Sequence, residues 1–119
     1  DVVKRRLSDG AITVLSTPSY MYHCSAANYL DGDWVTIDGW SDSGVPYVNE
    51  LVAVAKDGGA VGRLCHLQNM ASPAYDQEPH PSPSPTGKRV IFCSTWRDTT
   101  TPAGIYICDW RGFSLGSYT

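Results

Sequence analysis

The stretch that decides the fold is DQEPHPSPSPTGKRVIFCSTWRDTTTPAGIYICDW, residues 76–110. Residues 84–87 (SPTG) form a tight turn, because proline fixes φ and glycine adopts conformations closed to other residues. Residues 90–93 and 105–108 are short runs of mainly β-branched and aromatic side chains, and a polar segment at 97–102 separates them. This pattern predicts a turn followed by a β-hairpin.

A proline-rich segment leads into this hairpin and carries polar side chains. Gln77, Glu78 and His80 lie among prolines, so the segment cannot be helical. A strand unit with polar groups at its entrance is therefore expected here.

Length and composition describe one globular domain. The chain has 119 residues, of which 42% are hydrophobic and 18% charged, enough apolar side chains for a modest core. The net charge of −3 argues against a nucleic-acid partner, and the basic run at residues 4–6 is interpreted as a solvated edge.

No apolar run approaches the roughly 20 residues that span a membrane, so no membrane partner is expected. The chain begins at Asp1 without a methionine or a signal-type segment, which predicts a piece of a longer protein.

Four cysteines, Cys24, Cys65, Cys93 and Cys108, show no metal-ligand spacing. Each lies within or at the end of a predicted strand. We expect free, buried thiols that act as small hydrophobic side chains, with disulfides as the alternative. Free thiols favour a reducing compartment, which points to the cytoplasm.

Two kinds of turn recur along the chain. Residues 7–12, 55–61 and 108–113 each combine Asp with Gly, at intervals of about 50 residues. A second kind, at residues 29–35, is echoed at 85–90 about 55 residues later. Four-stranded propeller blades produce interleaved turns with such a period. We therefore predict an all-β chain of β-propeller blades, each a four-stranded antiparallel sheet, without a helix of normal length.

The repeat divides the chain into about two and a half blades. Residues 1–16 are interpreted as a half blade, residues 21–65 as a full blade and residues 79–118 as another. The strands expected in the two full blades lie near residues 21–28, 33–38, 48–55, 60–65, 90–93, 105–108 and 113–118. Long connections at residues 40–46 and 68–77 are expected to be loops on this scaffold, where binding groups tend to lie.

Two and a half blades cannot close a ring, since a propeller normally needs at least four. The blades at the open ends would expose apolar sheet faces, which favour association. We expect either self-association of this chain or the remaining blades of a longer propeller.

The stretch PHPSPSPTGKRVIFCS, residues 79–94, resembles the blade signature of TolB-like, WD40-like bacterial β-propellers. In that family the turn between strands is typically Ser-Pro-Asp-Gly-Lys, and Thr86 stands here in the place of the Asp. The resemblance implies a propeller fold.

His23 and His80 are candidate metal ligands. Aligning the glycines of the two matching turns places His23 opposite Glu78, and Ser25 opposite His80. Alternation along the innermost strands would keep all four on one face, towards the central channel. Two imidazoles with an amide or carboxylate could hold Mn, Zn or Ni. The alternative is a set of hydrogen-bonded structural groups, because no HxH, HxxxH or HExxH pattern occurs.

His23, the Asp-Gly pairs that follow it, and Gln77-x-x-His80-Pro-Ser also resemble the C-terminal blades of oligogalacturonate lyases. These are seven-bladed propellers that bind Mn through His and Gln side chains at the channel mouth. The resemblance implies that His23, Gln77 and His80 bind Mn or another divalent metal. Glu78 stands where the family has a second His, and we assign it to substrate binding. In that chemistry a uronate carboxylate binds the metal, a base removes the adjacent C–H proton, and the glycosidic oxygen leaves.

The other polar and aromatic candidates are less specific. The catalytic base is unknown: Arg63 and Arg97 are candidates only by elimination, and each fits an ordinary surface charge. His66 is interpreted as a structural group that closes a blade by hydrogen bonding. Trp40 and Trp96 lie beside polar loops, where exposed rings could stack on sugars and bind substrate; the alternative is a place in the core.

Two classes of function follow. The first is a metal-dependent polysaccharide lyase that binds an acidic oligosaccharide at the channel mouth. The second is a non-catalytic propeller, either a TolB-like interaction module or the gating domain of a prolyl-oligopeptidase-type enzyme. Metal binding separates the two classes, because only the first requires it.

Overall fold

The computed structural model describes residues 2–16, 21–30, 32–39, 49–68, 77–96 and 103–110. Within these ranges the secondary structure is β-strand, and no helix long and apolar enough to cross a membrane occurs there. The strands are β1 (Val2–Arg5), β2 (Ile12–Ser16), β3 (Met21–Ser25), β4 (Trp34–Gly39), β5 (Glu50–Ala55), β6 (Val61–His66), β7 (Ser82–Pro83), β8 (Arg89–Ser94) and β9 (Gly104–Asp109).

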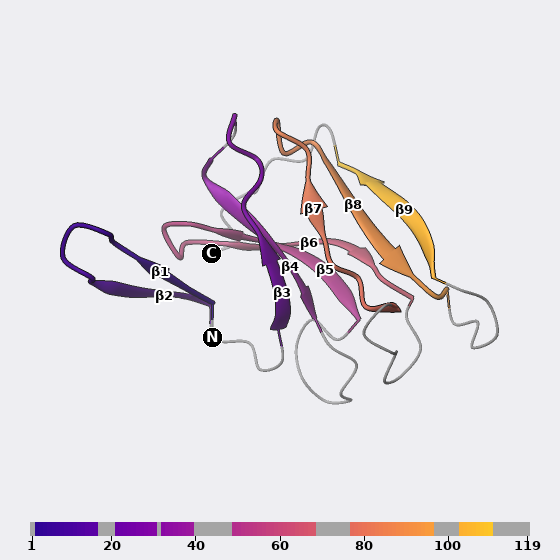
Figure 1. Ribbon diagram of the computed structural model, residues 1–119, viewed down its shortest axis with the longest axis horizontal. Helices are drawn as coiled ribbons and strands as arrows, with labels where there is room; N and C mark the ends of the chain where they lie inside the picture. Colours follow the sequence, from indigo (N-terminus) through magenta and orange to yellow (C-terminus); the bar gives the residue numbers. More distant parts are fainter. Residues whose placement is uncertain are drawn as a thin grey trace.

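The strands form three antiparallel sheets in which each strand pairs with the next one along the chain (Figure 1). They are the hairpin β1-β2, the four-stranded sheet β3-β4-β5-β6 and the three-stranded sheet β7-β8-β9. The all-β prediction is confirmed. The four-stranded sheet spans the residues expected to form one full blade. The strand predicted at 113–118 lies outside the described residues.

Short turns with glycine connect the strands at one end of the two larger sheets. Gly58, with φ of 80°, donates its N–H to Ala55, and Gly87, with φ of 70°, donates to Ser84. These φ values lie in the left-handed region that glycine adopts without steric cost. We call this end, formed by the β3–β4, β5–β6 and β7–β8 connections, the turn end.

The opposite end contains the first residues of β3, β5 and β9 and the last residues of β4, β6 and β8. It also contains residues 77–81, which lead into β7. We call this the loop end. Hydrogen bonds join the two larger sheets at both ends. Leu30 N–H donates to Pro85 at the turn end, and the Ser94 hydroxyl donates to the Leu67 carbonyl at the loop end.

The core lies between stacked sheets. Side chains alternate across a strand, so Trp34, Leu51 and Ala53 face the three-stranded sheet while Ile37, Val52 and Val54 face the hairpin. Opposite the first group lie Val90, Phe92 and Trp110, and opposite the second lies Leu15. The central strands β4 and β5 are therefore buried on both faces.

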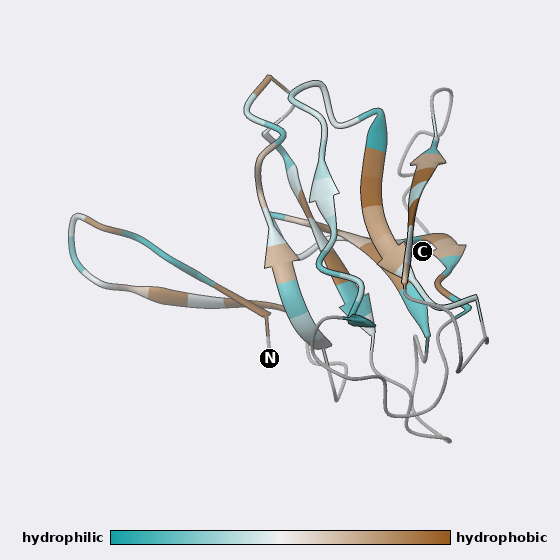
Figure 2. Ribbon diagram, turned by 45° about the vertical axis from the view of Figure 1, so that its right-hand side comes forward, coloured by the Kyte–Doolittle hydropathy of each residue, from teal (hydrophilic) through white to brown (hydrophobic). Residues whose placement is uncertain are grey.

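The two outer layers each leave aliphatic side chains exposed. On the hairpin, which projects away from the larger sheets in Figures 1 and 2, Ile12 and Val14 are exposed. On the far face of the three-stranded sheet, Ile91, Ile105 and Ile107 are exposed, and hydrophobic colour runs along β8 and β9 in Figure 2.

The cysteines are free thiols, but their burial differs from the expectation. Cys65, Cys93 and Cys108 are half-buried, and Cys24 is exposed on β3. The expectation of a buried thiol is therefore wrong at Cys24. Its side chain lies on the opposite face of β3 from His23, because neighbouring residues of a strand point to opposite faces.

Candidate functional site

His23 is held by a buried carboxylate on the neighbouring strand. Asp38, on β4, is 2% exposed. Its Oδ1 accepts the backbone N–H of His23 at 2.6 Å, and its Oδ2 lies 2.8 Å from His23 Nδ1. One carboxylate therefore fixes both the main chain and the ring of His23. The antiparallel pairing of β3 with β4 brings the two residues together.

Glu78 and His80 come from the segment before β7. Prolines 79 and 81 flank His80, which has a φ of 42°. Glu78 is buried, whereas His80 is exposed. The expectation that both residues alternate on the innermost strand is wrong, because β7 is only Ser82–Pro83. Instead, the left-handed backbone at His80 interrupts the extended chain just before β7, which lies beside β3.

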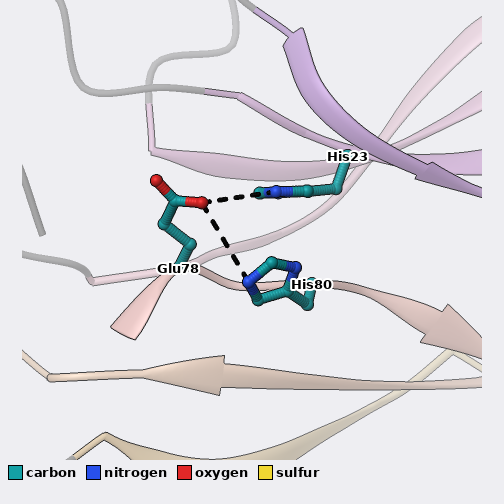
Figure 3. Close-up of side chains that lie close together, drawn as sticks. All are labelled: His23, Glu78 and His80. Carbon is teal, nitrogen blue, oxygen red and sulfur yellow. Dashed lines mark ion pairs between the residues drawn. The ribbon is translucent and has the colours of Figure 1, made fainter. Parts of the chain in front are cut away.

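The three side chains meet at the loop end (Figure 3). Glu78 Oε2 lies 3.3 Å from His23 Nε2 and 4.0 Å from His80 Nε2. The two imidazole rings have centroids 4.0 Å apart. One ligand atom from each residue can be chosen so that all three lie within 4.8 Å of one another.

The hydrogen bond to Asp38 determines which nitrogen of His23 faces the cluster. Nδ1 donates its proton to the Asp38 carboxylate, so in the neutral ring Nε2 presents a lone pair. That lone pair points towards Glu78 Oε2, which is also an acceptor, at 3.3 Å. Two facing acceptors repel unless a cation lies between them. Either a proton on Nε2 or a metal ion meets this requirement.

Burial increases the need for positive charge. Asp38 and Glu78 are both less than one-tenth exposed. Among the described residues, the ion pairs of these two carboxylates are with His23 and His80, and none is with Lys or Arg. Burial of a carboxylate favours a positive charge beside it. A divalent ion would balance both charges while the imidazoles stay neutral.

The donor set fits a divalent transition metal. Two imidazole nitrogens and one carboxylate oxygen suit Zn, Mn, Fe or Ni. Ligands about 2.1 Å from an ion in tetrahedral geometry are about 3.4 Å apart, close to the separation of His23 and Glu78. Three protein ligands leave at least one coordination position open for an exogenous ligand. Asp38 accepts the hydrogen bond of the other ring nitrogen of His23, as a carboxylate outside the ligand set commonly does for a metal-binding histidine.

The remaining predicted site residues lie in different places. Gln77 is half-buried and directly precedes Glu78. Trp96 is 55% exposed and stacks on Tyr106 with centroids 5.0 Å apart. Trp96 follows β8 at the loop end, on the side where Cys93 N–H donates to Pro79. Trp40 and Arg97 lie outside the described residues.

Arg63 and His66 belong to a separate charged group. Both are exposed, and both face the buried Glu50. Arg63 Nε lies 3.0 Å from Glu50 Oε2, and His66 Nδ1 lies 3.7 Å from Glu50 Oε1. Ser25 accepts a hydrogen bond from the Thr36 hydroxyl through its backbone carbonyl.

Asp38 is the site residue that sequence reasoning missed. It appeared only as part of an Asp-Gly pair, without a role. Knowledge of the register of the β3–β4 hairpin would have identified it, because pairing Cys24 with Ile37 places Asp38 beside His23.

Comparison of the chain with protein-family models, curated proteins and solved structures finds no significant match.

Proposed function

We propose that the chain binds a divalent transition-metal ion at the loop end through His23, Glu78 and His80, with Asp38 orienting His23. The cluster of one ligand atom each from His23, Glu78 and His80, all within 4.8 Å of one another, carries the proposal. Two stacked antiparallel sheets supply the ligands, an arrangement that agrees with neighbouring propeller blades. Gln77 lies next to the cluster in sequence and is a candidate fourth ligand.

The ligand proposed for the open position is the carboxylate of an acidic sugar, and the reaction is β-elimination as in a polysaccharide lyase. A bound metal would supply a Lewis acid that stabilises negative charge on the uronate carboxylate. On the protein side, Asp38 fixes the Nδ1 proton of His23, and Glu78 contributes negative charge at the buried end of the site. The exposed ring of Trp96 offers a face for a sugar at the loop end.

The first experiment is a calorimetric titration of the chelator-treated protein with Mn²⁺, Zn²⁺ and Ni²⁺. We expect one site per chain, and we expect His80→Ala to weaken binding at least 100-fold. His66→Ala is the matched control, because His66 is also an exposed histidine at the loop end but faces Glu50. Absence of binding in the wild type would leave a proton between His23 and Glu78 and would refute the metal site.

Lyase activity is tested separately, with oligogalacturonate and the ultraviolet absorbance of the unsaturated product. Metal-dependent product formation that His80→Ala abolishes would support the enzyme. If the protein binds metal but forms no product, the metal site is supported and the lyase proposal is refuted.

The second candidate is a non-catalytic propeller that associates through its outer layers, and the exposed aliphatic faces favour it. Because each sheet packs on the next, we propose that the exposed hairpin of one copy packs on the exposed β8-β9 face of another. Such a head-to-tail contact uses two different surfaces. Ring closure by further blades of a longer chain is the alternative.

Mixing two variants tests the head-to-tail contact. Ile12→Lys blocks the hairpin face and Ile107→Lys blocks the sheet face. We expect the wild type to form oligomers in light scattering and each variant alone to be monomeric. An equimolar mixture should form a dimer, because it retains one intact copy of each face. A monomeric wild type at high concentration would exclude self-association.

A further inference from the structure

Three aromatic rings form a continuous stack at the loop end of the three-stranded sheet. Trp96 follows β8 and stacks on Tyr106 of β9, with ring centroids 5.0 Å apart and 23° between the ring planes. Tyr106 in turn stacks on Phe92 of β8, with centroids 5.9 Å apart. Phe92 is buried, whereas Trp96 is 55% exposed. The stack therefore runs from the core to the surface, and its outermost member is an indole ring.

The backbone of Trp96 is also held in place. Its N–H donates to the Ser94 hydroxyl oxygen at 3.0 Å, and the Ser94 hydroxyl donates to the Leu67 carbonyl of the neighbouring sheet. Ser94 is fully buried. Because both its backbone and its ring are fixed by other residues, the exposed indole is preorganised. A preorganised ring loses little conformational freedom when a ligand packs on it.

A glycine makes room for the stack. Gly104 pairs with Ser94 at the start of β9. A Cβ on Gly104 would lie 3.0 Å from Cε2 of Tyr106 and 3.1 Å from its hydroxyl oxygen, which is tighter than an ordinary contact. The Tyr106 ring therefore lies against the backbone of Gly104. A side chain at position 104 would displace Tyr106, and Trp96 with it.

The stack and the candidate metal cluster lie at the same end of the sheet but on different strands. Pro79, between Glu78 and His80, accepts the N–H of Cys93 on β8, which joins the segment with the cluster to the strand that leads to Trp96. In the sheet order, β9 is two strands from β7, about 10 Å at the usual strand spacing. A chain of linked sugars can bridge that separation, whereas a single sugar cannot contact both places.

The chemistry of an exposed ring face favours a sugar ring. The face of an aromatic ring carries partial negative charge. The C–H groups on one side of a pyranose ring carry partial positive charge, and stacking removes apolar surface of both partners from water. The net charge of −3 disfavours a nucleic-acid base as the partner. Such stacking requires neither a charged side chain nor a metal ion.

We propose that Trp96, supported by Tyr106, forms a second sugar subsite, separate from the metal position. It holds a ring of an acidic oligosaccharide other than the ring whose carboxylate binds the metal. The inference rests on the proposed ligand, an acidic oligosaccharide, but not on the metal ion or on the lyase reaction. The subsite selects chains over single sugars, because only a chain reaches both the metal position and Trp96.

The experiment titrates the chelator-treated protein with trigalacturonate and follows the indole and backbone N–H signals by NMR. We expect binding without metal, and we expect Trp96→Ala to weaken it about 10-fold. Trp96→Phe should give an intermediate affinity, because it keeps a smaller aromatic face. Ile105→Ala is the matched control, since Ile105 is exposed on the opposite face of β9 and its loss should leave the affinity unchanged.

Gly104→Ala tests the stack without removing Trp96. We expect weaker trigalacturonate binding, because the added Cβ displaces Tyr106, while the metal affinity of this variant and of Trp96→Ala stays unchanged. Wild-type protein that binds no trigalacturonate without metal, or Trp96→Ala that binds it equally well, would overturn the subsite. A loss of sugar and metal binding together in Trp96→Ala would overturn its independence. Sugar binding that depends on Trp96 in a protein that binds no metal would refute the metal site and support the subsite.

Discussion

The turn end and the loop end of the two larger sheets reach left-handed backbone conformations in different ways. At the turn end, Gly58 and Gly87 have positive φ. At the loop end, the residues with positive φ have side chains; among the described residues they are Asn49, Gln68, His80 and Trp96. Such a conformation costs about 1–2 kcal/mol for a residue with a Cβ and little for glycine.

The two ends also differ in the side chains that they bring together. The loop end gathers His23, Asp38, Glu78 and His80, and His80 is one of its residues with positive φ. The turn end instead carries close packing, since the Trp34 ring covers Gly87. Backbone strain in proteins is concentrated at functional sites. The turn end is thus held by glycine turns and close packing, whereas the loop end holds the side chains of the candidate site.

The largest effect is expected from Gly87→Ala at the turn end. A Cβ on Gly87 would overlap Cζ2 of the Trp34 ring, and Trp34 is buried, so its ring cannot move aside freely. We expect a loss of about 3 kcal/mol in the free energy of unfolding, measured in urea.

Gly10→Ala is the matched control for that change. Gly10 has a φ of 75°, but a Cβ there would meet only the exposed Arg5 side chain, at 3.3 Å. We expect a loss of about 1 kcal/mol from backbone strain alone. Equal losses in the two variants would show that packing on Trp34 does not constrain the turn end.

Asp38→Asn tests whether Asp38 orients His23 at the loop end. The amide keeps the volume of the carboxylate but cannot hold the Nδ1 proton of His23 with a negative charge. We expect metal affinity to fall about 10–100-fold, equivalent to about 1.4–2.7 kcal/mol. Glu50→Gln removes another buried loop-end carboxylate and should leave metal affinity unchanged. If both variants bind equally well, Asp38 does not orient the ligand.

Gln68→Gly tests whether the loop end is strained. Gln68 has a φ of 55°, so glycine would relieve the conformational cost while adding flexibility to the unfolded chain. We expect a net gain of about 0.5 kcal/mol in the free energy of unfolding. Gln77→Gly, at a loop-end position without a positive φ, should lose stability instead. A loss in both variants would contradict strain at Gln68.

The smallest effect is expected in the β1–β2 turn. Asp9 accepts a hydrogen bond from Arg6, which lowers the pKa of its carboxyl, and the Ala11 N–H adds to this. The folded pKa is below the unfolded one, so the stabilisation is present above the unfolded pKa. It is lost as the pH falls through the folded pKa. In an NMR titration Arg6→Gln should raise the pKa of Asp9, whereas Arg5→Gln should not.

Much of the strand pattern could be predicted from local sequence. The Val-rich run at residues 50–55 (ELVAVA), with its place in the repeat, and the SPTG turn at 84–87 predict a strand and a tight turn, and both occur. Local patterns failed at Glu78 and His80, which were expected on a strand. The proline-rich segment does not form that strand, because proline has no N–H to donate to a ladder.

Local sequence patterns are enough to predict antiparallel strands joined by glycine turns in this chain. The periodicity of apolar side chains and the residues that form turns depend on neighbours in the chain, so both can be recognised in the sequence without knowledge of the fold. The three-dimensional fold was needed to show that Asp38 contacts His23 and that Glu78 lies near both imidazoles. These contacts depend on the register of strands and on how one sheet stacks on the next. Both are determined by burial of the shared core, which no single segment specifies.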